Sequence, residues 1–228
     1  MGIKKYIWET PEVSVYSGKH SKALKVVRVI SLVLMALVFL TTFPFEPETY
    51  FLFLTCWGIT LCLIYYFLVI VALFWKPVDP YSYVFFEISW AIEWVITLYY
   101  WCFIAGLNGV EGNIVSDLAQ HALPMVLLIV DYSLNRVLIL RAHYLIVTMV
   151  FLVYILLVNM PYTLAQDEEI YPEINYENAF TYISFLICLV IAAVSLELGR
   201  YIKKKSKTSD ERQIERTPEV ERNPDSRS

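Results

Sequence analysis

Six apolar stretches alternate along the chain with short polar segments. They cover residues 23–43, 50–75, 83–107, 114–134, 143–164 and 179–201. Roughly 20 predominantly apolar residues are enough for a helix to cross the hydrocarbon core of a bilayer. The pattern therefore predicts six transmembrane helices in a domain of residues 23–202, after an N-terminal segment of residues 1–22 and before a polar tail of residues 203–228.

The composition favours the same fold class. Of the 228 residues 58% are hydrophobic, and the mean hydropathy is +0.55, both outside the range of soluble domains of this size. We expect an all-α, polytopic membrane protein, a bundle of six transmembrane helices integral to an endomembrane or the plasma membrane. The tail is rich in Ser, Glu, Arg, Asp and Pro, a composition typical of disordered segments.

The basic residues indicate an orientation, because all 18 fall into four segments that the six-helix pattern places on one side. Six precede or begin the first stretch and end at Arg28, Lys76 follows the second, Arg136 and Arg141 follow the fourth, and nine lie at or after Arg200. The loops on the other side are acidic instead. The positive-inside rule then places both termini in the cytoplasm. The basic run 200–207 adjoins a membrane helix, which favours contact with anionic lipid and argues against a nucleic-acid partner.

Polar side chains inside the apolar stretches are costly and are therefore candidates for pairing or function: Arg28, Thr55, Glu93, His121 and Asp131. Counted from the non-cytoplasmic helix ends, Thr55 lies roughly 7 Å deep and His121 roughly 10 Å deep. A hydroxyl and a desolvated, neutral imidazole at matching depth could act as nucleophile and general base.

Three neighbours could support such a site. Asp117, Pro124, Leu128 and Asp131 share one helical stripe with His121, so the Asp117 carboxylate at i−4 could orient the imidazole. Pro124 cannot donate to the carbonyl of Gln120 and is expected to kink the helix there. Gly58, one turn after Thr55, would let a neighbouring helix or an acyl chain approach closely.

Each of these residues also has an ordinary structural explanation. Thr55 could bond to the carbonyl at i−4, and His121 to a nearby backbone group or water. Glu93, near the middle of the third stretch, is expected to be protonated or hydrogen-bonded, with proton or ion transport as a weaker alternative. Arg28, Glu87, Asp131 and Glu197 fall near the cytoplasmic helix ends and are expected to form a structural ion cluster.

Four stretches resemble one family of membrane proteins: VVRVISLVL in the first apolar segment, FLTCWG around Thr55, QHALPMVLLIVD from Gln120, and IYPEINY before the last segment. They are similar to the androgen-induced and rolling stone superfamily of six-span proteins, with the closest pattern in the rolling stone branch. The resemblance implies an intramembrane hydrolase that cleaves fatty-acid esters of hydroxy fatty acids with a threonine and a histidine, here Thr55 and His121. Cys56 stands where the rolling stone pattern has Asn, and that branch is associated with cell fusion.

Two hypotheses of function follow. In the first, Thr55 attacks and His121 moves the proton in hydrolysis of a long-chain lipid ester drawn from the membrane, with Asp117, Gly58 and Glu93 in supporting positions and no cofactor or metal. No Lys or Arg lies in the outer half, so a neutral or zwitterionic ester suits these residues at least as well as an anionic one. In the second, the chain is a non-catalytic protein of adhesion, cell fusion or scaffolding.

Overall fold

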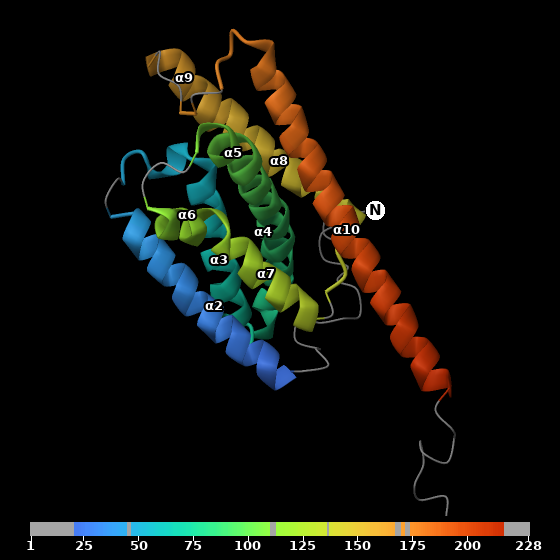
Figure 1. Ribbon diagram of the computed structural model, residues 1–228. Coiled ribbons are helices and arrows are strands. Elements are labelled where there is room, and N and C mark those ends of the chain that lie inside the picture. Colours follow the sequence, from blue (N-terminus) through green and yellow to red (C-terminus); the bar gives the residue numbers. More distant parts are fainter. Residues whose placement is uncertain are drawn as a thin grey trace, which may run out of the picture.

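The computed structural model describes residues 21–44, 47–109, 113–135, 137–166, 170–171 and 174–216, and within these it is helical and without strands. The predicted N-terminal segment lies outside the described residues, apart from its last two. Figure 1 shows α2 along one side of the molecule and α10 along the other, with α3, α4 and α7 between them. The all-α architecture predicted from the sequence is confirmed for this part of the chain.

The helices follow the six apolar stretches in order. The bounds are α2 Ser21–Thr42, α3 Leu54–Val71, α4 Asp79–Tyr99, α5 Ala105–Asn108, α6 Ile114–His121, α7 Leu123–Leu134, α8 Tyr144–Tyr154, α9 Met160–Gln166 and α10 Ala179–Arg216. Short 3₁₀ turns cover Tyr50–Leu52 (η1), Lys76–Val78 (η2) and Arg141–His143 (η4). Two π-helical segments, η3 (Tyr100–Ile104) and η5 (Ile155–Asn159), join α4 to α5 and α8 to α9.

Several of these helices are suited to a membrane. Lys22–Thr42, Leu54–Val71, Arg141–Gln166 and Ala179–Lys205 are each long and apolar enough to cross one. The pair α6 and α7 would make a fifth span, bent by 42° at its break. Integral membrane character therefore has support from five of the six predicted stretches.

The remaining stretch, α4, differs because it lies at the centre of the bundle. It contacts α3, α7, α8 and α10, and most of its residues are buried, including Glu87 and Glu93 at 0% exposure. An aromatic cluster of Tyr65, Phe86, Trp90 and Tyr132 packs along it. Neighbouring helices surround α4, so it carries polar residues that a lipid-facing helix would exclude.

Two helices end or break where local chemistry dictates. The fourth stretch breaks at Ala122 (φ −134°), two residues before Pro124, as the missing amide of that proline predicts. Asp117 and Asp131 therefore do not share one straight helical stripe. The last helix is drawn to Arg216, because Lys, Glu, Arg and Gln are good helix formers and extend a helix already nucleated. The disorder expected for residues 203–228 stays a prediction. Residues 217–228 lie outside the described part.

The charged side chains at the predicted cytoplasmic end form three separate pairs rather than the single cluster expected from the sequence. Arg28 binds Asp131 at 2.8 and 3.0 Å, the buried Glu87 and His143 side chains contact each other, and Arg141 binds Glu197 at 2.6 Å on the surface. The first pair joins α2 to α7, the second joins α4 to η4, and the third joins η4 to α10. Each charged side chain therefore meets a partner on the element that packs against its own. His143 was not foreseen, because it stands at a helix start.

Candidate functional site

The cavity that lies around Thr55 has a volume of about 530 Å³, within the range of ligand pockets in proteins. It lies at the end of the bundle where α2 ends and α3 begins. Its walls come from α2, α3, α4, α6, α8, α10 and both π-helical segments. Its polar lining consists of Thr41, Thr42, Tyr50, Thr55, Cys56, Tyr99, Tyr100, Gln120, His121, Tyr154, Tyr171, Ser184 and Cys188.

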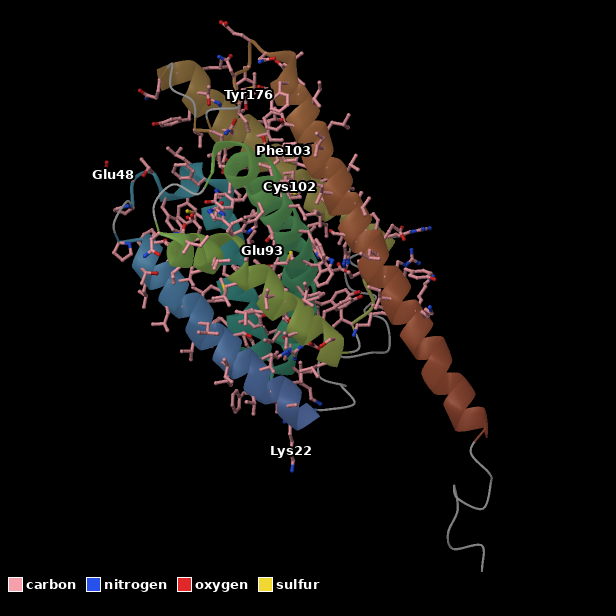
Figure 2. All side chains as sticks on the ribbon, in the orientation of Figure 1. Lys22, Glu48, Glu93, Cys102, Phe103 and Tyr176 are labelled. Atoms are coloured by element: carbon pink, nitrogen blue, oxygen red, sulfur yellow. The ribbon has the colours of Figure 1, made fainter. Side chains whose placement is uncertain are left out.

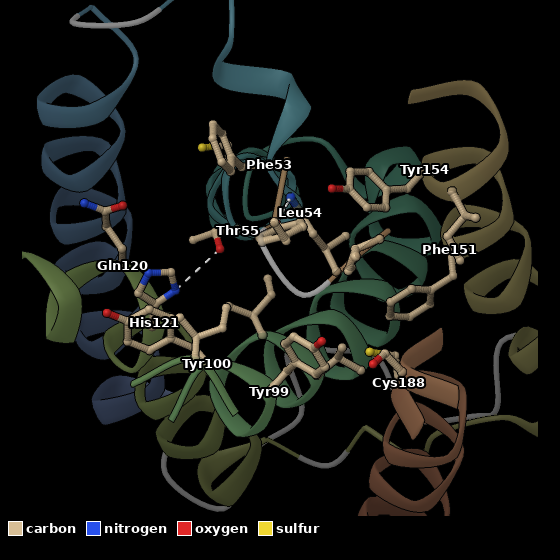
Figure 3. Close-up of a pocket in the computed structure, with 18 of the residues that line it drawn as sticks. Phe53, Leu54, Thr55, Tyr99, Tyr100, Gln120, His121, Phe151, Tyr154 and Cys188 are labelled. Atoms are coloured by element: carbon tan, nitrogen blue, oxygen red, sulfur yellow. Dashed lines mark hydrogen bonds between the residues drawn. The ribbon is translucent and has the colours of Figure 1, made fainter. Parts of the chain in front are cut away.

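Thr55 and His121 meet in this cavity. The Thr55 Oγ1 and His121 Nδ1 atoms are 3.4 Å apart, and Figure 3 shows the two side chains pointing toward each other. The hydroxyl can donate to Nδ1 when the ring proton is on Nε2. The predicted proximity, within about 5 Å in one cavity, is present; the catalytic roles stay a prediction.

Thr55 differs from several other threonines in the helices. The hydroxyls of Thr41, Thr60 and Thr148 donate to the carbonyl four residues earlier. Thr55 is the second residue of α3, and Phe53 before it has extended backbone (ψ 131°), so no helical turn precedes it to supply that carbonyl. The structural explanation considered from the sequence therefore does not account for its hydroxyl, whose partner here is His121.

The ring of His121 is held by an aromatic neighbour. The Tyr100 ring lies parallel to it, with centroids 3.6 Å apart and an interplanar angle of 10°. Tyr100 is the first residue of the π-helical segment η3, and such segments are frequent at functional sites. Sequence reasoning missed Tyr100, since apolar periodicity does not show where a helix widens.

Asp117 does not hold the imidazole as the sequence suggested it could. Among the hydrogen bonds of the described residues none joins Asp117 to His121, and Asp117 Oδ2 has no partner. The carboxylate lies one turn before the histidine on α6 and acts on the imidazole through its negative charge.

Gly58 and Glu93 lie together beneath the cavity, where α3 meets α4. A Cβ placed on Gly58 would be 2.4 Å from both Glu93 Oε1 and Ile96 Cδ1, so the glycine permits this close helix contact. The thiol of Cys62 donates to Glu93 Oε1 at 3.6 Å. Both residues belong to the contact between α3 and α4, and neither lines the cavity.

A tyrosine from the loop before α10 fixes the start of α3. The Leu54 N–H donates to the Tyr171 hydroxyl at 2.9 Å, and the Tyr171 ring packs edge-on against Phe53. Burial raises the pKa of Tyr171 to about 12, so its hydroxyl stays protonated. Tyr171 belongs to the IYPEINY stretch, which was the only signal for it in the sequence.

This local structure has a chemical consequence at Thr55. The first N–H groups of a helix have no intrahelical carbonyl and form its electropositive end. Cys56 and Trp57 donate to Phe53 O, and Leu54 donates to Tyr171, so the Thr55 N–H is the donor at this helix start that could meet the carbonyl oxygen of an ester attacked by Thr55 Oγ1. The arrangement could support attack on an ester carbonyl. Within the described chain no group of three or more His, Cys, Asp and Glu could hold a metal ion.

Comparison of the chain with protein-family models, with curated proteins and with solved structures finds no match. The function therefore has to be argued from the residues of the cavity.

Proposed function

We propose that this protein crosses a membrane six times, with α4 as the sixth, central span and both termini in the cytoplasm. The burial of α4 by its neighbours supports this topology, because a sheltered helix tolerates the two glutamates that lower its hydropathy. Cavity residues at one end of the helices and basic residues at the other fit a bundle of alternating direction.

Within that bundle, Thr55 and His121 hydrolyse a long-chain lipid ester. The Thr55 hydroxyl attacks the ester carbonyl while His121 Nδ1 takes its proton, and the alcohol leaves with that proton. Water, activated by the same imidazole, then cleaves the acyl–Thr55 intermediate, which releases the fatty acid and restores both side chains. The Thr55 N–H and the positive end of α3 stabilise the oxyanion in both steps.

The observation that carries this proposal is the 3.4 Å contact between Thr55 Oγ1 and His121 Nδ1 inside a cavity with mainly apolar walls. A contact of this length is expected without substrate, since catalytic hydrogen bonds often tighten only in the complex. The resemblance of the chain to the androgen-induced and rolling stone superfamily agrees with the same pair and with a lipid ester as substrate.

A fluorophosphonate probe, which reacts with activated hydroxyl nucleophiles, tests the proposal on the purified protein. We expect wild-type protein and Thr60→Ala to be labelled and Thr55→Ala not to be. Thr60 is a matched control, because it loses a hydroxyl from the same helix at a position outside the cavity. Thermal unfolding in detergent shows whether each variant is folded. Labelling that survives in folded Thr55→Ala removes Thr55 as the nucleophile, and folded wild-type protein that is not labelled leaves the non-catalytic interpretation standing.

A further inference from the structure

We propose that the cavity takes an electrically neutral long-chain ester, whose carbonyl lies at Thr55 and whose acyl chain extends toward Phe151 and Cys188. This inference rests on the proposed hydrolysis for the position of the ester group. The neutrality of the ligand is argued from the charges of the cavity lining and of the residues around it.

The cavity wall offers no countercharge to an anionic substrate. Its lining contains no Lys, Arg, Asp or Glu, and His121 is its single imidazole. A carboxylate or phosphate in such a wall would lose its hydration without gaining an ion pair, which is strongly unfavourable. An ester without charge loses little by the same transfer.

Among the described residues, no Lys or Arg lies at this end of the bundle either. Arg28 is 14 residues before Thr42 on α2, which is roughly 20 Å along the helix axis. Lys76 follows the far end of α3, Arg141 precedes α8, and Arg200 lies three turns or more beyond Cys188 on α10. Each distance exceeds the screening length of about 8 Å at physiological salt, so none of these charges can attract an anion to the cavity.

Negative charge surrounds the cavity end instead. Glu48 and Glu177 are exposed there, and Asp117 stands one turn from His121 with one carboxylate oxygen unpartnered. Figure 2 shows Glu48 and Tyr176 at the end of the molecule opposite Lys22. A substrate with a carboxylate would be repelled on approach, whereas a neutral one would not.

The shape of the cavity indicates the direction in which the acyl chain of the ester lies. Gln120 and His121 lie on one side of Thr55, while Phe151 and Cys188 lie on the other side of the cavity (Figure 3). Val95, Ile96 and Leu189 add apolar surface to the lining. The polar side suits the ester and its alcohol, and the side toward Phe151 and Cys188 suits the hydrocarbon tail.

A matched pair of substrates tests the charge preference. One is palmitate esterified to 12-hydroxystearic acid, and the other is the methyl ester of the same compound, which lacks the charge; release of palmitate is measured for both, so that cleavage of the added methyl ester is not counted. Both are offered to the purified full-length protein in uncharged detergent micelles at neutral pH. We expect kcat/KM for the neutral compound to be at least tenfold higher; equal or reversed values overturn the inference while the proposed hydrolysis stands.

If neither compound is cleaved, the proposed hydrolysis fails, and binding decides the present inference separately. Thr55→Ala protein is then labelled with a photoreactive, uncharged palmitoyl ester in competition with each compound. The neutral competitor must reduce labelling at least tenfold more effectively than the acid. Equal competition contradicts a cavity selective for neutral esters.

The direction of the acyl chain is tested by filling the far side of the cavity. Cys188→Phe should lower the ratio of 16-carbon to 4-carbon ester hydrolysis at least tenfold. Cys102→Phe is the matched control, because Cys102 is exposed and lies outside the cavity lining, so the ratio should not change. An unchanged ratio in folded Cys188→Phe would show that the acyl chain does not lie beside Cys188.

Discussion

His121 has two neighbours that fix its ring, and they act in different ways. Thr55 meets the ring edge through Nδ1, and Tyr100 covers the ring face at 3.6 Å. Histidine ligands and bases in proteins are often oriented by a carboxylate on the second nitrogen, and here a stacked aromatic ring holds the imidazole instead. Tyr100 is therefore a positioning residue, because it acts on His121 and needs no contact with the reacting atoms.

Tyr100 variants separate stacking from the tyrosine hydroxyl. Tyr100→Phe keeps the ring and should retain kcat within about threefold, whereas Tyr100→Leu should lower kcat by about tenfold or more with a smaller change in KM, because the imidazole is then less well placed. Steady-state kinetics on the two purified variants measures the difference. Equal activity of the two variants would show that stacking does not matter.

Among the connecting elements, two π-helical segments contribute to the cavity. Tyr100 and Ile104 of η3 and Ile155 of η5 all line it. A π turn widens a helix and changes the direction of the side chains that follow it. The break between α6 and α7 directly follows His121 and ends the helix at that residue. Three irregular elements therefore contribute to the walls of one site.

At the end of the bundle opposite the cavity, a buried ion pair joins α2 to α7. Arg28 on α2 and Asp131 on α7 are 3% and 0% exposed, and Asn135 also donates to Asp131 at 2.8 Å. Asp131→Asn removes the carboxylate that Arg28 contacts and should destabilise the protein by about 3 to 5 kcal/mol. Glu197→Gln breaks the exposed pair with Arg141 and should have little effect.

Thermal or denaturant unfolding in detergent compares these two variants. We expect a clear loss of stability for Asp131→Asn alone. Similar losses for both variants, or none for either, would mean that the buried pair does not hold α2 against α7.

On the scale of the whole molecule, the cavity and the ion pairs lie at opposite ends of the bundle. The sequence predicted this polarity, because the basic residues recur at every second helix end. It also predicted most helix limits, the break near Pro124 and the meeting of Thr55 with His121. These features depend on local chemistry and on depth along a helix, which spacing in the sequence determines.

Other features depend on packing between distant segments, so spacing could not reveal them. The central position of α4, the stacking of Tyr100 and the bond from Leu54 to Tyr171 each join residues from different elements. The sequence does not indicate how far α10 extends beyond residue 203, because a disordered composition and a charged helix use the same residue types.

The proposed topology can be tested on the intact protein. Single cysteines at Thr49 and Asn175 should react with a membrane-impermeant maleimide added from the non-cytoplasmic side, in a background without the four native cysteines. A tag at either terminus should be reached only from the cytoplasm, since every Lys and Arg would otherwise be misplaced. A C-terminal tag found on the far side would overturn the orientation.

The most direct test of the account is the turnover of a neutral long-chain ester by the purified protein. Wild type should hydrolyse it, Thr55→Ala and His121→Ala should each lower kcat at least about 10²-fold, and Thr60→Ala should remain near wild type. All four proteins must unfold at similar temperatures for the comparison to hold. Hydrolysis by folded Thr55→Ala at a rate close to that of wild type would contradict a catalytic threonine in this cavity.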